Sequence, residues 1–375
     1  MAGQHSTAGL ARAIAAQALH TDDLMAIPGV VGTAVGLGAN GEAVVKIYTA
    51  AGGIAGLPRT LDGVGVRVEV TGRFFAVHHV CDHFGGPPDS DKIPCEDPPV
   101  EDPPPDEGGT AVDPTARFTR PVPIGVSSGT TRSITDFSCS TGTLGARLKS
   151  GNKVYALSNN HVYALENVGV VGDDIVQPGP VDTDPVCENI AADKIGDLAA
   201  YVDIVFSTSA NTNNRVDAAI AETIKIDSGG GVMVDSVGTA TPADGYGEPK
   251  TNILVCGSDD CLGLSVQKYG RTSGLTKGTV SGIIATINIG YSTGTARFVD
   301  QIVVSGNKGG FIKSGDSGSL LVVDDAGDPD DRRPVGLLFA GSQGGKTAIA
   351  NQIGDVLSEL DDVLGGGASL SVDGD

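Results

Sequence analysis

The sequence predicts a mainly β protein with a short helix near each end. Three observations carry this prediction: 55 glycines, frequent Val, Ile and Thr, and a near absence of long apolar stripes at helical spacing. Glycine is typical of turns and β-branched residues are typical of strands, so we expect many short strands joined by turns. With 375 residues, 40% of them hydrophobic, the chain can build one large core and a second folded unit.

The first 84 residues are expected to form a small α+β domain. An Ala-rich helix is predicted over residues 7–19, and three β-like runs follow at residues 30–36, 43–48 and 64–70. Asn40-Gly41, between the first two runs, is typical of a hairpin turn. No constellation of chemically reactive side chains is recognisable in this domain.

The composition changes abruptly at residue 85. Residues 85–109 are rich in Pro, Asp and Glu and almost without apolar side chains, which is typical of an extended linker, and we place this linker at residues 85–119. From Arg120 short β-like runs recur to about residue 350, which assigns a large β domain to residues 120–364. Apolar residues at helical spacing predict a closing helix over residues 354–364, and the three glycines after it begin a tail, residues 365–375.

Charge and hydropathy exclude some partners. The 25 Lys and Arg against 46 Asp and Glu give a net charge of −21, so a phosphate backbone would be repelled and nucleic acid is not an expected partner. No apolar run approaches the roughly 18 residues of a membrane helix, so a membrane is not expected either. Residues 1–20 make a poor signal peptide, which leaves the compartment unknown and favours the cytoplasm over secretion.

The six cysteines are an even number but too few in this length to define a disulfide scaffold. Cys256 and Cys261 are close enough in sequence to close a small loop. A Cys81–Cys95 bridge is a second candidate in an oxidising compartment. Six reduced structural thiols in a cytosolic protein are equally compatible with the sequence.

The segment around Ser317 carries the most chemical information. Gly315-Asp316-Ser317-Gly318 precedes a β-like run that begins at Leu320. A serine between glycines on a tight turn can expose its hydroxyl, and the main-chain N–H groups of such a turn can converge on one oxygen.

Two further segments offer partners for this serine. A β-like run ends in a polar turn at His161, and a histidine can take the proton of a serine near neutral pH. Asp217 stands among small and apolar residues, where a carboxylate is costly to bury unless it is paired. These residues occur in the order His, Asp, Ser, at intervals of 56 and 100 residues, which suits two barrels of about six strands each.

Together these segments resemble the chymotrypsin-like serine peptidases, from about residue 121 to residue 362. The run Ser158-Asn159-Asn160-His161-Val162 resembles the histidine segment of the bacterial high-temperature-requirement proteases. Residues 269–274, Tyr-Gly-Arg-Thr-Ser-Gly, resemble a segment of the bacterial lytic and streptogrisin-type proteases. The resemblance implies two six-stranded antiparallel β-barrels with a C-terminal helix, and hydrolysis of protein or peptide substrates through an acyl-enzyme without a cofactor.

Residue by residue, the resemblance makes Ser317 the nucleophile, His161 the general base and Asp217 the carboxylate that orients the histidine. The N–H groups of Gly315 and Ser317 become the oxyanion donors. Asp316 is expected to be buried and to need a cation, and Arg271 stands in the segment that supplies one in the bacterial branch.

The primary pocket is expected along two stretches. Residues Phe311 to Ser314 precede the nucleophile, and Leu338, Phe339, Ala340 and Gly341 belong to the predicted substrate-pairing strand. Neither stretch offers an acidic side chain, so a small or medium apolar residue is expected before the cleaved bond and a basic one is not. The sequence departs from relatives at Val162, Ser319 and Phe339, which weakens any transfer of specificity.

Weaker patterns favour structural explanations. The ligand types at His78, His79, Cys81 and His83 do not have the spacing of a common zinc site, and no metal site is predicted. The Asp-rich residues 324–331 lack the spacing of an EF-hand and indicate a solvated turn. Residues 341–347 lack the spacer of a phosphate-binding loop.

Two functions follow from the sequence. The first is a serine endopeptidase, and the alternative is a catalytically silent peptide-binding or scaffold protein of the same fold. The N-terminal domain is compatible with a pro-segment or regulatory unit that contacts the peptidase domain or a partner.

Overall fold

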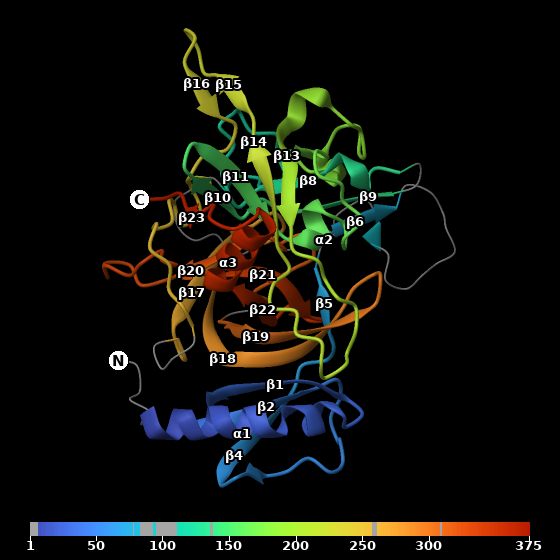
Figure 1. Ribbon diagram of the computed structural model, residues 1–375, viewed down its shortest axis with the longest axis vertical. Helices are drawn as coiled ribbons and strands as arrows, with labels where there is room; N and C mark the ends of the chain where they lie inside the picture. Colours follow the sequence, from blue (N-terminus) through green and yellow to red (C-terminus); the bar gives the residue numbers. More distant parts are fainter. Residues whose placement is uncertain are drawn as a thin grey trace.

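A computed structural model describes residues 7–77, 79–82, 93–94, 111–135, 138–256, 261–307 and 310–375, without the side chains of residues 81, 82, 93 and 94. The fold is mainly β, with two large antiparallel sheets and a helix close to the C-terminus, as the sequence predicts. In Figure 1 the N-terminal segment lies at one end, beneath the second barrel, and the first barrel lies at the opposite end.

The first barrel holds the strands from β8 to β14. Its hydrogen-bonded order is β10-β11-β14-β13-β12-β8-β9, and only Leu144 and Gly145 separate β9 from β10, so the two ends of this order meet. A core that includes Ile124, Leu144 and Ile195 fills it. The strands are β8 (Ser127–Thr130), β9 (Ser138–Thr143), β10 (Ala146–Ser150), β11 (Lys153–Ser158), β12 (Asp174–Val176), β13 (Lys194–Tyr201) and β14 (Ala219–Thr223).

Short elements surround this barrel. Helix α2 (Asn160–Tyr163) follows β11, and a hairpin of β15 (Lys225–Asp227) and β16 (Met233–Asp235) projects from the barrel in Figure 1. At the two edges of the sheet, β23 (Ser371–Val372) pairs with β10, and β6 (His79–Asp82) pairs with β9 and with β7 (Ile93–Pro94). Three single 3-10 turns cover residues 131–133, 180–182 and 191–193.

The second barrel is closed by its own hydrogen bonds. Its order is β17-β20-β21-β22-β19-β18, and β18 pairs back to β17. Helix α3 (Ile353–Val363) follows β22 and buries Ile353, Val356 and Leu360 in a core shared by strands of both barrels. The strands are β17 (Ser265–Gly270), β18 (Gly274–Gly290), β19 (Thr295–Gly306), β20 (Leu320–Val323), β21 (Pro334–Ser342) and β22 (Thr347–Gln352).

The N-terminal segment forms the expected helix and strands, and it is joined to the second barrel by main-chain pairing. Strand β1 pairs antiparallel with β18, which makes one continuous sheet, and β1 and β2 form the hairpin predicted at Asn40-Gly41. Helix α1 runs beyond the predicted residue 19 because Thr21 and Leu24 are also buried. Its elements are α1 (Thr7–Met25), β1 (Val30–Leu37), β2 (Ala43–Thr49), β3 (Thr60–Leu61) and β4 (Val64–Val70).

Strand β5 (Phe74–Ala76) leaves the N-terminal segment and enters the space between the two barrels. It pairs antiparallel with β21 and parallel with β18, and the chain then reaches β6 on the first barrel. The first 84 residues thus contribute strands to both large sheets. The division of the chain at residues 84 and 119 stays a prediction, because within the expected linker only residues 93–94 and 111–119 are described.

Two disulfides lie within the described residues. Cys256–Cys261 closes the small loop that the sequence suggested, and Cys139–Cys187 is a pairing that the sequence analysis missed. Cys95, and with it the proposed Cys81–Cys95 bridge, lies outside the described residues, as do His78 and His83.

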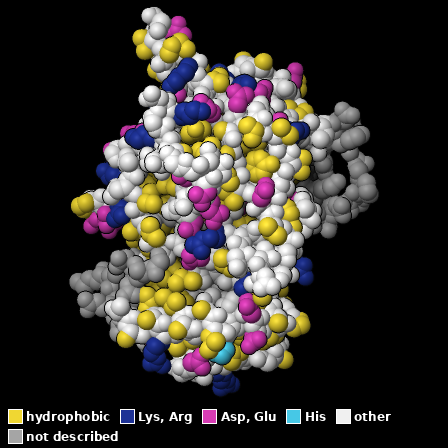
Figure 2. Space-filling view, viewed as in Figure 1, with side chains coloured by type: hydrophobic (Ala, Val, Ile, Leu, Met, Phe, Trp, Pro, Cys, Tyr) yellow, Lys and Arg dark blue, Asp and Glu magenta, His cyan; other side chains and the backbone are white. Residues whose placement is uncertain are grey.

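The other sequence patterns have structural explanations. Residues 341–347 span the end of β21, the turn after it and the start of β22. In the exposed turn at residues 324–331, the Asp331 carboxylate accepts the Asp325 N–H and the Asp328 carboxylate accepts the Asp330 N–H. The part of the chain that the structure describes contains no cluster of three potential metal ligands and no helix long and apolar enough to cross a membrane. Figure 2 shows acidic and basic side chains interspersed on one face, with acidic groups gathered at its centre.

The shared core of α1 and the second barrel leads to a stability prediction. Leu24 is 4% exposed and belongs to the same apolar cluster as Val280, Ile283 and Ile302. We expect Leu24→Ala to lower the free energy of unfolding by about 2–5 kcal/mol and to speed hydrogen exchange in β18 and β19. Leu19→Ala, on the same helix at 71% exposure, should change it by less than about 0.5 kcal/mol. If Leu24→Ala left the hydrogen-exchange rate in β18 unchanged, the N-terminal segment would fold independently of the second barrel.

Candidate active site

His161 and Asp217 form a buried pair at one edge of the first barrel. His161 lies in α2, directly after β11, and Asp217 lies two residues before β14, the strand that pairs with β11. This pairing brings together residues far apart in the sequence. The Nδ1 atom of His161 lies 2.6 Å from Asp217 Oδ2, and the His161 main-chain N–H donates to Asp217 Oδ1 over 3.1 Å. Neither side chain is exposed.

Asp217 has a third donor that the sequence analysis missed. The hydroxyl of Tyr291, the residue after β18, donates to Asp217 Oδ2 over 2.9 Å. Burial, with Asp217 and Glu166 close by, raises the pKa of Tyr291 well above its usual value, so it remains a donor at neutral and mildly alkaline pH. Phe339, one of the positions at which the sequence departs from relatives, offers no side-chain donor to this aspartate, and the hydroxyl comes from the residue after β18.

A second carboxylate fixes the turn that carries Tyr291. Glu166, 6% exposed, accepts hydrogen bonds from the N–H and hydroxyl of Ser292 and from the N–H of Thr293, all within 3.1 Å. Burial alone would raise the pKa of Glu166, but these hydrogen bonds hold it below the ordinary value. A carboxylate of the first barrel therefore holds a hairpin turn of the second barrel against Asp217.

Ser317 lies on a turn at the start of β20, and it is fully buried. Its main-chain oxygen accepts from Thr143 of the first barrel over 2.8 Å, and both this oxygen and Val162, the neighbour of His161, lie against Gly142. The structure thus brings the His161 and Ser317 segments to one place. Gly315 has a φ of +95°, and a Cβ there would clash with Thr272 and Arg271, so this turn requires glycine.

The cation beside Asp316 is not the predicted one. Lys268 Nζ lies 3.1 Å from Asp316 Oδ2, and both side chains are completely buried. Burial alone would raise the pKa of Asp316, but the Lys268 ammonium and hydrogen bonds from Ser273 and the Lys313 main chain hold it below its usual range. Burial lowers the pKa of Lys268 against the opposing effect of Asp316.

The predicted Arg271–Asp316 ion pair is therefore wrong. Arg271 is buried, and its guanidinium forms a two-pronged contact with Asp182 of the first barrel. Arg271 does lie against Gly315 of the Ser317 loop, but its guanidinium is held by Asp182. Lys268, on β17, reaches the Asp316 carboxylate instead. Asp182 was not identified from the sequence, because no local pattern marks it.

The predicted pocket residues come from β21 and from the segment before Ser317, and their role in binding substrate stays a prediction. Leu338, Phe339, Ala340 and Gly341 are consecutive residues of β21, Phe311 is buried in the core of the second barrel, and Ser314 precedes the glycine turn. The hydroxyl of Ser317 donates to the main-chain oxygen of Phe339 over 3.1 Å. Strand β5 pairs along Ala340 and Gly341.

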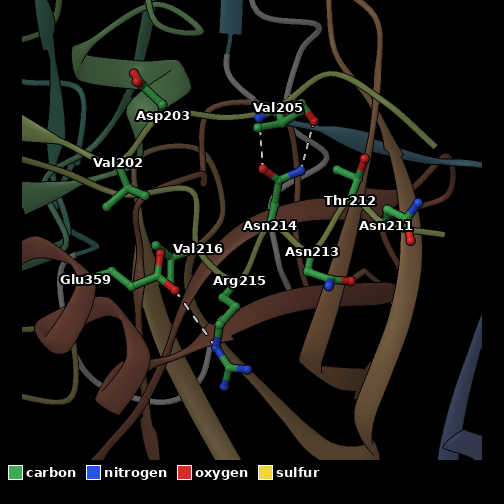
Figure 3. Close-up of a pocket in the computed structure, with 10 residues that line it drawn as sticks. All are labelled: Val202, Asp203, Val205, Asn211, Thr212, Asn213, Asn214, Arg215, Val216 and Glu359. Carbon is green, nitrogen blue, oxygen red and sulfur yellow. Dashed lines mark hydrogen bonds and ion pairs between the residues drawn. The ribbon is translucent and has the colours of Figure 1, made fainter. Parts of the chain in front are cut away.

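A separate hollow lies beside the loop that leads to Asp217 (Figure 3). None of the predicted site residues lines it. The Asn214 side chain hydrogen-bonds both main-chain groups of Val205 and closes the loop, while Arg215 pairs with Asp300 and Asp355 and lies 3.9 Å from Glu359. Its lining residues are Val202, Asp203, Val205, Asn211, Thr212, Asn213, Asn214, Arg215, Val216 and Glu359.

This protein is of the double-barrel class with a chymotrypsin-like fold. Its histidine and aspartate come from the first barrel and its serine from the second. Within this class, the family described as the Nal1 C-terminal domain matches residues 126–356. The match covers more than half of the chain, so the chain belongs to this family.

A sequence relative of this chain is a plant protein and not a bacterial protease. Protein NARROW LEAF 1 of Oryza sativa subsp. japonica is 29% identical over 207 residues, which cover 54% of this chain and 34% of the rice protein. The chain thus spans about a third of the length of this relative.

Several solved structures with a similar chain path are proteases by name. Thermobifida fusca protease A matches with a TM-score of 0.39 at 16% identity, over 63% of this chain and 92% of its own. A glutamic acid-specific serine protease matches with a TM-score of 0.40 at 15% identity, over 67% and 100%. Cellulomonas bogoriensis chymotrypsin matches with a TM-score of 0.33 at 16% identity, over 62% and 92%.

The buried Lys268–Asp316 pair generates a test. Lys268→Met leaves the Asp316 carboxylate buried without its cation, so we expect the free energy of unfolding to fall by about 3–5 kcal/mol. Lys277→Met provides the control, because Lys277 is 51% exposed and pairs with Asp324 at the surface, and its effect should stay within about 1 kcal/mol. Chemical denaturation measures both, and equal small losses would contradict the assignment of Lys268 as the cation for Asp316.

Proposed function

We propose that this protein is a serine-type endopeptidase in which Ser317, His161 and Asp217 act as the catalytic triad. The observation that carries the proposal is the buried 2.6 Å contact of His161 Nδ1 with Asp217, combined with a peptide carbonyl held by Gly315 N–H beside Ser317. A histidine whose Nδ1 is held by a carboxylate has the orientation that proton transfer through Nε2 requires, and N–H donors beside a serine suit the oxyanion of an acyl transfer.

Each residue then has one role. Ser317 Oγ attacks the carbonyl carbon of a peptide bond and its proton passes to His161 Nε2. Gly315 N–H and Ser317 N–H stabilise the negative oxygen that forms. His161 returns the proton to the leaving amine, and water releases the acyl group from Ser317 by the same steps. Asp217 holds the imidazole in the required tautomer, and Asp316 with Lys268 supports the turn.

Labelling of the full chain with a fluorophosphonate probe tests this proposal. Wild-type protein should become labelled at Ser317 on prolonged incubation, because only an activated serine reacts with such a probe, and Ser317→Ala should show no labelling. Ser305→Ala, a hydroxyl loss in β19, is the control and should label like wild type. Failure of the wild-type chain and of every variant to label would favour the catalytically silent, peptide-binding alternative.

The Tyr291 hydroxyl provides a second test. Tyr291→Phe removes one of the donors to Asp217, and hydrogen bonds to charged groups contribute about 1.5–3 kcal/mol. We therefore expect labelling to slow by about tenfold or more. Tyr201→Phe removes a hydroxyl that donates to the main chain of Gly169 in the first barrel, and it should leave the labelling rate unchanged. If the two variants unfold at similar temperatures and are labelled at equal rates, Tyr291 does not contribute to the reactivity of Ser317.

A further inference from the structure

Strand β5 lies along the strand predicted to bind substrate. It pairs antiparallel with β21, where Phe75 lies opposite Gly341 and Ala76 lies opposite Ala340. Proteins commonly bind an extended peptide in this way, by adding a strand to a sheet edge. The edge of β21 next to Ser317 is therefore already occupied by this chain itself.

Val77, the residue after β5, makes the contacts that a reacting residue would make. Its N–H lies 3.3 Å from Ser317 Oγ and 3.4 Å from the main-chain oxygen of Phe339. Its carbonyl oxygen accepts the Gly315 N–H over 2.5 Å. Because Gly315 is the proposed oxyanion donor, the Val77 carbonyl lies where a substrate carbonyl would be polarised.

The side chain of Val77 fits the expected pocket. It is half-buried and packs against the apolar cluster that includes Phe311 and Ile312. A side chain at Gly341 would contact both Ile312 and Val77, so this glycine leaves room for a residue of the size of valine. The occupant agrees with the small or medium apolar preference inferred from the sequence.

Burial supports the same interpretation. Ser317 has no exposed surface and His161 is 1% exposed. The segment is also held on both sides: β1 ties the N-terminal unit to β18, and β6 pairs with β9 of the first barrel. A peptide can reach Ser317 only after Val77 has moved away from it.

We propose that Phe74–Val77 is an internal inhibitory strand that occupies the substrate site, with Val77 in the primary pocket. The proposal rests on the proposed function and extends it in two ways. The full chain is self-inhibited, and its own segment is a template for the substrate class: an extended peptide with a small or medium apolar residue at the reacting carbonyl, a small residue before it and aromatic residues before that.

Covalent attachment makes weak binding sufficient for inhibition. A segment held near its site by a short connection has an effective concentration in the millimolar range. A free peptide of equal intrinsic affinity at ~10 µM would therefore occupy the site in roughly 1% of molecules. The site therefore opens only to a substrate that binds more tightly than β5 does, or after a conformational change that moves β5.

The test compares two full-length variants by their rate of fluorophosphonate labelling at Ser317. Val77→Asp places a charge in an apolar pocket, which is unfavourable, so the segment should leave the site and labelling should speed up about tenfold or more. Val70→Asp places the same charge on β4, where Val70 is 61% exposed, and it should label at the wild-type rate.

A second variant and a second probe keep the test independent of folding defects in Val77→Asp. Val77→Gly removes the side chain from the pocket without adding a charge, and we expect labelling to speed up about three- to tenfold. A Phe-Phe-Ala-Val peptide aldehyde should protect Ser317 in Val77→Gly at a concentration at least about tenfold below that required for the wild type.

The outcomes separate the two proposals. Faster labelling of both Val77 variants, with Val70→Asp at the wild-type rate, supports internal inhibition. If the wild type, both Val77 variants and Val70→Asp are labelled at the same rate, internal inhibition is overturned and the proposed function stands. If Ser317 is labelled in none of them, the proposed function fails, and the inhibitory role of β5 fails with it.

Discussion

Strand β18 is the main-chain scaffold on which the rest of the structure depends. Its 17 residues pair with β17 and β19 to complete the second barrel, and they also pair with β1 and β5 of the N-terminal segment. Main-chain N–H and C=O groups that are buried must be paired, so a strand this long imposes its position on all four partners. Its end delivers Tyr291 to Asp217. The barrel, the N-terminal unit and the candidate site are thereby fixed to one element.

The candidate site is assembled across the boundary between the barrels. His161 and Asp217 come from the first barrel, whereas Ser317 and Tyr291 come from the second. Charged groups also join the two halves: Glu166 holds the turn after β18, and Asp182 pairs with Arg271. Buried charges of this kind are tolerated because each has a partner and hydrogen bonds. The same contacts connect the two halves of the site.

The structure changes the interpretation of the N-terminal segment more than that of any other part of the chain. In the sequence it is a small unit with no reactive side chains, compatible with several roles. In the structure its strands extend the sheet of the second barrel, and its last residues lie against Ser317. A segment that binds through main-chain hydrogen bonds leaves little trace in side-chain identity, which is why the sequence could not choose between these roles.

The sequence by itself determined the local features: the β-rich character, the hairpin at Asn40-Gly41 and the closing helix. It also singled out His161, Asp217 and Ser317, whose roles as site residues stay a prediction. Short sequence patterns, such as glycine turns and apolar spacing, encode the local features without any contribution from distant residues. Only the tertiary structure decided that Lys268 pairs with Asp316, that Tyr291 donates to Asp217 and that Val77 lies beside Ser317. Each is a contact between residues distant in sequence, and which groups meet is set by strand register and barrel closure, which no local pattern encodes.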